Sequence, residues 1–297
     1  MGKLTVPLVR ARKASRGRGA PLVMVTAYDA PSARTADAAG VDLLLVGDSV
    51  AMVVLGHDDT MSVTVEEMAH HTRAVRRASP QALVVADLPW LSYHVSIEDT
   101  LRNAAALIRA GASAVKLEGG HKRVRMVEAL VDAEIPVMGH LGLTPQSMHA
   151  MGGFRVQGKT AGAARALVDD ALALEAAGVF ALVLEGVPDV VGRLATDALA
   201  IPTIGIGAGP WCDGQVLVYH DVLGLEDRVV PTFVRRYADL KRAGVEAISA
   251  YAADVRSGRF PSAAESYHLK PEEAAALGLD ATTGAPPAPD TAAGLYS

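Results

Sequence analysis

Short hydrophobic runs alternate with longer amphipathic segments along most of this chain. The runs are rich in Val, Leu and Ile, and continuous runs of this length are typical of parallel strands buried on both faces. Eight strands are therefore predicted, at Leu22–Ala27, Asp42–Gly47, Ala82–Asp87, Ala114–Glu118, Pro136–His140, Phe180–Glu185, Ile201–Gly205 and Val216–His220. Alanine-rich helices are predicted between them, for example at Val65–Ala78, Ile97–Ala110 and Thr160–Ala177.

The order of these segments indicates the fold class. Ser96 is a candidate N-cap for the helix at 97–110, and Gly111 is its expected stop. Three similar phrases, AAGVDLLLV, RAGASAVKL and EAAGVFALVL, each show a helix that ends at glycine, turns and enters a buried strand. Regular alternation of this kind indicates a parallel sheet covered by helices. Eight strands over about 230 residues favour a closed (βα)8 barrel, the TIM barrel, over an open doubly wound sheet.

Four of the hydrophobic runs end abruptly in a carboxylate, at Asp48, Asp87, Glu118 and Glu185. Proteins of the α/β class build their active sites at the carboxyl ends of parallel strands. A barrel brings such positions together around one axis, and four negative charges there would repel one another unless a cation held them. The pattern therefore predicts a metal-dependent enzyme site.

The alternation of side chains along a strand predicts which way these acids point. Because successive side chains point to opposite faces, Asp48 is expected to share one face with Leu44 and Val46. The same alternation puts Lys116 and Glu118 on one face of the strand predicted at Ala114–Glu118.

Asp48 and Asp87 are the strongest metal candidates, and Glu118 is expected to complete the group, directly or through a metal-bound water. Hard divalent cations take oxygen ligands, and Mg2+ commonly uses one or two carboxylates while keeping several waters. Each aspartate by itself could equally cap the following turn or helix. Three carboxylates at equivalent strand ends favour the metal site.

Four other residues near the strand ends could take part in chemistry. Lys116 could pair with the acids or donate to an anionic substrate, and its expected protonation disfavours a Schiff base. Glu185 could be a general base whose pKa is raised by an apolar mouth, another metal ligand or an N-cap. His140 could donate a hydrogen bond to substrate or be structural. Ser49 could bind a carboxylate or simply form the turn.

Composition narrows the class of protein. Acidic residues exceed basic ones, 33 to 28, and the net charge of −5 argues against non-specific nucleic-acid binding. Cys212 is the only cysteine, which excludes an intramolecular disulfide and fits a reducing compartment. No apolar stretch approaches the roughly 18 residues of a membrane span, and no signal-peptide core precedes the first strand, so a cytoplasmic protein without membrane contact is expected. The segment IPTIGIGAGP lacks the helix and the acid-ended strand that a dinucleotide site requires.

The ends of the chain differ from its middle. Residues 1–20 carry six basic side chains and no acid, and are expected to form a solvated or subunit-contacting arm rather than a transit peptide. Residues 21–262 are expected to form a single catalytic barrel. Residues 263–297, which become Ala- and Pro-rich, are expected to be a largely flexible extension without a role in the chemistry.

Nine segments follow one another between Thr5 and Pro261: TAYDAPSA, LLLVGDSVAMVVLGH, VTVEEMAHHTRAV, VVADLPW, LRNAAALIRAGASAVKLEGG, PVMGHLGLTPQS, GGFRVQGK, LVLEGVP and IPTIGIGAGPWCDGQVLVYHDVLG. Together they resemble the ketopantoate hydroxymethyltransferase family of pantothenate biosynthesis. The resemblance implies a barrel of the phosphoenolpyruvate mutase/isocitrate lyase type. It also implies a homo-oligomer, often a decamer.

The resemblance further implies a reaction and a role for each candidate residue. The residues that match the metal positions, for one Mg2+ per subunit, are Asp48, Asp87 and Glu118. Those that match positions in contact with the 2-oxo acid are Asp48, Ser49, Asp87 and Lys116. Glu185 matches the proton acceptor, and His140 matches a position in the substrate pocket. In the implied reaction, Glu185 removes the C3 proton of 3-methyl-2-oxobutanoate to give a Mg2+-stabilised enolate. The enolate attacks the one-carbon unit of 5,10-methylenetetrahydrofolate and forms 2-dehydropantoate.

Two other classes of function compete with this interpretation. One is a lyase or mutase of the same barrel superfamily, although such enzymes commonly carry a reactive loop cysteine and Cys212 has no obvious activating partner in the sequence. The other is a catalytically silent barrel that serves as a binding or scaffold protein, which the intact set of charged residues disfavours. Folate dependence of turnover separates the first class from the transferase, and metal-dependent binding of the oxo acid separates the second.

Overall fold

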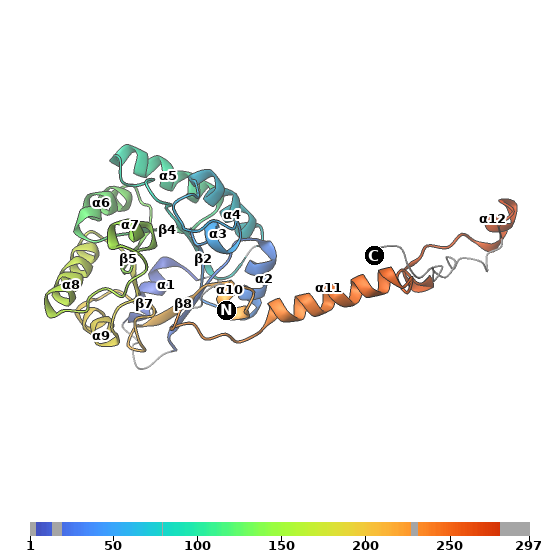
Figure 1. Ribbon diagram of the computed structural model, residues 1–297. Coiled ribbons are helices and arrows are strands. Elements are labelled where there is room, and N and C mark those ends of the chain that lie inside the picture. Colours follow the sequence, from blue (N-terminus) through green and yellow to red (C-terminus); the bar gives the residue numbers. More distant parts are fainter. Residues whose placement is uncertain (1–3, 14–19, 79, 227–230, 280–297) are drawn as a thin grey trace. The chain divides into compact units, whose positions relative to one another are not determined.

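Eight parallel strands form a closed barrel in the order in which they occur along the chain (Figure 1). The computed structural model describes residues 4–13, 20–78, 80–226 and 231–279. The strands are β1 Leu22–Thr26, β2 Leu43–Val46, β3 Leu83–Asp87, β4 Ala114–Glu118, β5 Val137–Gly142, β6 Ala181–Glu185, β7 Thr203–Ile206 and β8 Gly214–Leu217. The predicted (βα)8 fold is therefore confirmed. β8 ends before the predicted His220 because a short helix begins at Tyr219.

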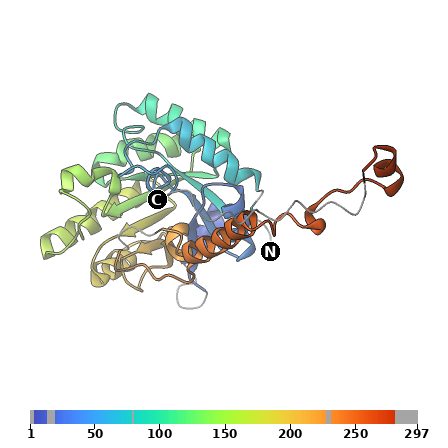
Figure 2. The same ribbon diagram turned by 45° about the vertical axis from the view of Figure 1, so that its right-hand side comes forward.

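A ring of helices surrounds the strands, as Figures 1 and 2 show from two directions. The longer helices are α2 Ala30–Ala38, α4 Val65–Arg77, α5 Ile97–Ala110, α6 Val124–Asp132, α8 Ala161–Ala176 and α9 Asp189–Ala198. Shorter helices at strand ends are α3 Val50–Val53, α7 Met148–Met151 and α10 Tyr219–Leu223, with 3-10 turns at His121–Arg123 and Pro145–Ser147. α5 has the predicted signals, since the Ser96 side chain caps its start and Gly111 ends it at φ +113°.

The hydrophobic core has two layers, one inside the barrel and one between the strands and the helices. Leu43 and Leu45 of β2 belong to the inner cluster, whereas Leu44 and Val46 belong to the outer one. Helix α1 (Val6–Ala11) contributes the fully buried Val9 to the inner cluster. Part of the expected N-terminal arm is thus a helix that helps to fill the barrel, because its apolar residues outweigh the neighbouring charges.

The chain divides into two compact units, the first ending at Tyr237 and the second beginning at Ala238. This division differs from the expected boundary after residue 262. The second unit contains α11 (Leu240–Arg256), a 3-10 turn at Ala263–Glu265 and α12 (Pro271–Ala276), and no residue of α11 is buried. Residues 280–297 of the extension expected to be flexible lie outside the described residues. Among the described helices, none is both long and apolar enough to cross a membrane.

Candidate active site

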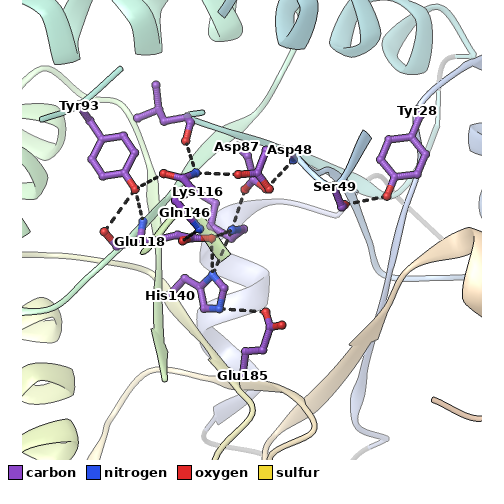
Figure 3. A network of polar contacts seen from close by, with 11 residues as sticks. Tyr28, Asp48, Ser49, Asp87, Tyr93, Lys116, Glu118, His140, Gln146 and Glu185 are labelled. Carbon is purple, nitrogen blue, oxygen red and sulfur yellow. Dashed lines mark hydrogen bonds and ion pairs between the residues drawn. The ribbon is translucent and has the colours of Figure 1, made fainter. Parts of the chain in front are cut away.

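Acidic side chains at the ends of β2, β3, β4 and β6 meet Lys116 of β4 and His140 of β5 at the carboxyl end of the barrel (Figure 3). Asp87 and Glu118 are the last residues of β3 and β4, and both are buried. The strand register sets their neighbours, because Asp87 pairs with Lys116 and Glu118 pairs with His140. The alternation that puts Lys116 and Glu118 on one face is confirmed by their contact, with Nζ and Oε1 4.0 Å apart.

Asp48 reaches this cluster by a different route from the one predicted. Its expected alignment with Leu44 and Val46 is wrong, because both of those side chains pack in the outer layer against the helices. β2 ends at Val46, and the turn that follows directs Asp48 inward, where its backbone N–H donates to Asp87 Oδ2 at 3.0 Å. Gly47 permits this turn, since a Cβ at that position would lie 2.8 Å from Ser49 Oγ.

Lys116 is the buried cation of the cluster. Its Nζ lies 2.9 Å from Asp87 Oδ1 and 3.3 Å from His140 Nδ1. Burial by itself would lower the pKa of Lys116, but the charges of Asp87, Glu118 and Asp48 raise it above its usual range. Lys116 therefore stays protonated, as its position among the acids predicted, and cannot readily form a Schiff base.

His140 bridges two of the acids. Its Nδ1 lies 3.2 Å from Glu118 Oε1, and its Nε2 lies 3.2 Å from Glu185 Oε2. Burial and the Lys116 charge lower the pKa of His140, yet its close contacts with the Glu118 and Glu185 carboxylates raise it to about 9. At neutral pH His140 is an imidazolium that holds both carboxylates in place. Its contact with substrate stays a prediction.

Gln146 and Tyr93 are the site residues that the sequence reasoning missed. The Gln146 amide donates to Asp48 Oδ2 (2.8 Å) and to the Leu88 carbonyl (3.0 Å), and its backbone N–H donates to Glu118 Oε2 (3.1 Å). The buried Tyr93 hydroxyl donates to Gln146 Oε1 at 2.6 Å and accepts from the Glu118 N–H at 3.1 Å. Gln146 lies in the segment PVMGHLGLTPQS, but neutral residues there carry no signal of their own.

Ser49 links the cluster to the loop after β1. Its hydroxyl lies 2.8 Å from the hydroxyl of Tyr28, which is 2% exposed. Burial raises the pKa of the Tyr28 phenol, so this side chain remains neutral. Figure 3 shows this contact on the opposite side of the cluster from Tyr93.

The donor set fits a hard divalent cation. Burial and the neighbouring Asp87 charge raise the pKa of Asp48, and burial raises the pKa of Asp87 despite Lys116. These shifts express mainly the cost of burying negative charge and, at Asp48, also repulsion by Asp87, and a cation would relieve both. The four carboxylates carry two more charges than Lys116 and the imidazolium neutralise, and a divalent cation supplies that difference.

The pKa of Glu118 is shifted in the opposite direction from the pKa values of Asp48 and Asp87. Although burial would raise its pKa, His140 and Lys116 lower it, so Glu118 is ionised and already paired. Within the described residues, no group of three or more His, Cys, Asp or Glu side chains is arranged as a metal site. A Mg2+ ion that takes two carboxylates and keeps its waters requires no such group, and Asp48 and Asp87 supply two carboxylates at the ends of adjacent strands.

A closed (βα)8 barrel with buried acids at the carboxyl ends of its strands has the architecture of an α/β-barrel enzyme. The chain aligns with the solved 2,3-dimethylmalate lyase, a member of the phosphoenolpyruvate mutase/isocitrate lyase superfamily, with a TM-score of 0.56 and 20% identity over 91% of this chain and 93% of that chain. It aligns with phosphonopyruvate hydrolase with a TM-score of 0.58 and 15% identity, over 94% and 95% of the two chains. At these identities the likeness establishes the fold.

The chain belongs to the ketopantoate hydroxymethyltransferase family, whose model matches residues 4–263. It is 57% identical over 266 residues to the 3-methyl-2-oxobutanoate hydroxymethyltransferase of Moorella thermoacetica, covering 89% of this chain and 98% of that protein. It is 56% identical over 267 residues to 3-methyl-2-oxobutanoate hydroxymethyltransferase 2 of Bradyrhizobium diazoefficiens, covering 90% of each. The family resemblance of the nine sequence segments is thus confirmed.

Proposed function

We propose that this protein transfers a hydroxymethyl group from 5,10-methylenetetrahydrofolate to 3-methyl-2-oxobutanoate and forms 2-dehydropantoate in the cytoplasm. The observation that carries the proposal is the pair Glu185 and His140 beside a buried acid cluster, in a chain that belongs to this transferase family. A base next to a cation-binding centre is what proton removal from a carbon adjacent to a keto group requires.

The proposed metal is Mg2+, held by Asp48 and Asp87, with Glu118 as a ligand directly or through water. When bound, the ion would polarise the keto oxygen of the substrate and acidify the adjacent C–H group. In this proposal Ser49, at the start of α3, hydrogen-bonds the substrate carboxylate. Lys116 offsets negative charge on the keto oxygen.

Glu185 is the proposed base. Its side chain is 15% exposed, against 2% for Glu118 and 3% for Asp87, so it is open to the barrel mouth from which a substrate enters. His140 orients Glu185 through Oε2 and leaves Oε1 for the C3 proton. C3 then bonds to the methylene carbon of the folate as the first of that carbon's two bonds to folate nitrogens, N5 and N10, breaks. Water then displaces the second nitrogen and supplies the hydroxyl oxygen, and the two nitrogens take up the former C3 proton and one proton of that water, which leaves tetrahydrofolate.

The proposal is tested by exchange of the C3 hydrogen into deuterated water. Glu185→Gln should abolish exchange while 3-methyl-2-oxobutanoate still binds by isothermal titration, whereas Glu128→Gln, on the exposed face of α6, should exchange at the wild-type rate. Undiminished exchange in Glu185→Gln would remove Glu185 from this role. A chelator should stop 2-dehydropantoate formation, and turnover of the oxo acid without any folate would favour the lyase or mutase alternative that the fold also accommodates.

We also propose a homo-oligomer, a decamer by family analogy, in which α11 of one copy covers the barrel of another. Exposed apolar side chains at Val245, Ile248, Tyr251 and Val255 follow helical spacing along α11. An apolar groove of ≈ 400 Å³ lies against β1, α2 and β8, where only the short α10 follows the last strand. Light scattering should give a multiple of the 30.8 kDa chain mass, and Ile248→Glu should lower it. A wild-type monomer would contradict this assembly.

A further inference from the structure

A second cavity lies at the same end of the barrel as the acid cluster. It has a volume of ≈ 360 Å³, within the ~300–1,000 Å³ range of small-molecule sites. Segments that follow three strands form it: Tyr28 and Asp29 follow β1, Val53 and Val54 at the end of α3 follow β2, and His220 of α10 follows β8. These residues belong to segments on which the family resemblance rests, yet the acid cluster uses none of them except Tyr28.

One wall of this cavity is joined to the proposed oxo-acid site. Tyr28 is one of the lining residues, and its hydroxyl contacts the hydroxyl of Ser49, next to Asp48. The wall that α10 forms is held against the loop after β1, because the backbone N–H of Tyr219 donates to Thr26 Oγ1 at the end of β1 (2.8 Å). A ligand in the cavity would therefore lie beside the oxo acid rather than on a separate face of the barrel.

The cavity is built for a flat, uncharged ring. The rings of Tyr28 and His220 have centroids 5.5 Å apart, and those of Tyr219 and His220 lie 5.9 Å apart. Burial lowers the pKa of His220, so this ring is neutral at pH 7. Its Nδ1 is buried and has no hydrogen-bond partner among the described residues, which leaves one polar atom for a ligand. None of the nine lining residues is Lys or Arg, which disfavours a phosphate-bearing ligand.

Asp29 adds an acceptor at the edge of the cavity. Its Oδ1 caps α2 by accepting from the Ser32 N–H at 2.7 Å and from the Ser32 hydroxyl at 2.6 Å. Its Oδ2 makes no hydrogen bond to any described residue. A free carboxylate oxygen beside aromatic walls suits a heterocycle whose edge presents N–H donors.

We infer that this cavity binds the reduced pterin ring of the folate co-substrate. The inference rests on the proposed function, since it assigns a place to the one-carbon donor of that reaction. The pterin stacks on Tyr28 and His220, and its 2-amino and ring N–H donors face Asp29 Oδ2. The one-carbon unit at the far end of the pterin then lies toward Ser49 and the oxo acid.

The test separates Asp29 as a ligand group from Asp29 as a helix cap. Asp29→Asn keeps the cap, because Asn is an equally good N-cap, but it replaces the free carboxylate oxygen by an N–H donor. It should raise the KM for methylenetetrahydrofolate about 10-fold or more while the KM for the oxo acid changes less than about 2-fold. The matched control is Asp37→Asn in the same helix. Oδ1 of Asp37 accepts from the backbone N–H groups of Gln81 and Ala82, away from the cavity. This control should leave both KM values unchanged.

A second variant fills the cavity instead of changing its charge. Val54 is 45% exposed, so Val54→Trp should fold normally and block the pterin, with Leu172→Trp on the exposed face of α8 as its control. Titration calorimetry with tetrahydrofolate should show binding to wild type, and binding at least about 10-fold weaker to Asp29→Asn and Val54→Trp.

Unchanged tetrahydrofolate affinity in both variants would overturn the inference. If the wild type makes no 2-dehydropantoate but still binds tetrahydrofolate in a way that Asp29→Asn weakens, the proposed function fails while the pterin site stands.

Discussion

Replacement of Gln146 tests whether the neutral groups of the site hold its acids together. Gln146 is 5% exposed, and its side chain makes three hydrogen bonds, to Asp48, Leu88 and Tyr93. Gln146→Leu keeps the approximate volume and removes all three bonds. The carboxylate of Asp48 and the hydroxyl of Tyr93 are then left buried without this partner.

The expected loss of stability follows from those three bonds. A hydrogen bond to a charged acceptor contributes about 1.5–3 kcal/mol and a neutral one about 0.5–1.5 kcal/mol. Part of this loss is offset in the variant, because the polar amide no longer has to be removed from water. We expect Gln146→Leu to lower the free energy of unfolding at pH 7 by about 2–4 kcal/mol. The control is Gln157→Leu, whose side chain donates to the nearby Arg155 carbonyl at the surface and should cost less than about 0.5 kcal/mol.

Urea unfolding followed by far-UV circular dichroism measures both variants. Equal free energies of unfolding for Gln146→Leu and Gln157→Leu would refute the argument that the Gln146 side chain holds Asp48, Leu88 and Tyr93 together.

Two further predictions concern pH and backbone conformation. Burial, followed by the charge of Arg123, lowers the pKa of His94 from 6.5 to about 4, so the unfolded chain binds a proton between these values that the folded chain does not. Stability from this source is complete above pH 6.5 and is lost as the pH falls toward 4, by at most about 2 kcal/mol because His94 is partly exposed. Between pH 7 and 5 the wild type should therefore lose more stability than His94→Gln, and parallel losses would count against this. Gly209 and Gly40 have nearly equal positive φ values, +77° and +78°, but a Cβ at 209 would lie 2.8 Å from Asp189 Cα whereas one at 40 meets nothing within 4 Å. Thermal or urea unfolding should show a cost of about 1 kcal/mol for Gly40→Ala and at least about 2 kcal/mol for Gly209→Ala, and equal costs would show that the loop relaxes freely.

The sequence by itself determined the barrel and most of the charged site. Continuous hydrophobic runs identified the eight strands, because a parallel strand covered on both faces has no polar side to show. Alternation along β4 correctly placed Lys116 beside Glu118, since both lie within the strand. Lys116 and His140 were candidates because both lie at the carboxyl ends of predicted strands, where barrels build their active sites.

Only the tertiary structure decided how those groups are joined. Asp48 lies beyond the end of β2, so the turn and not strand alternation sets its direction. Gln146 meets Asp48 across 98 positions of sequence, and His140 meets Glu185 because β5 and β6 pair in a particular register. Such contacts depend on where backbone segments lie in space, and a neutral glutamine or tyrosine has no local pattern that records its distant partner. The same reason explains why the boundary after Tyr237 and the cavity beside Tyr28 appear only once the chain is folded.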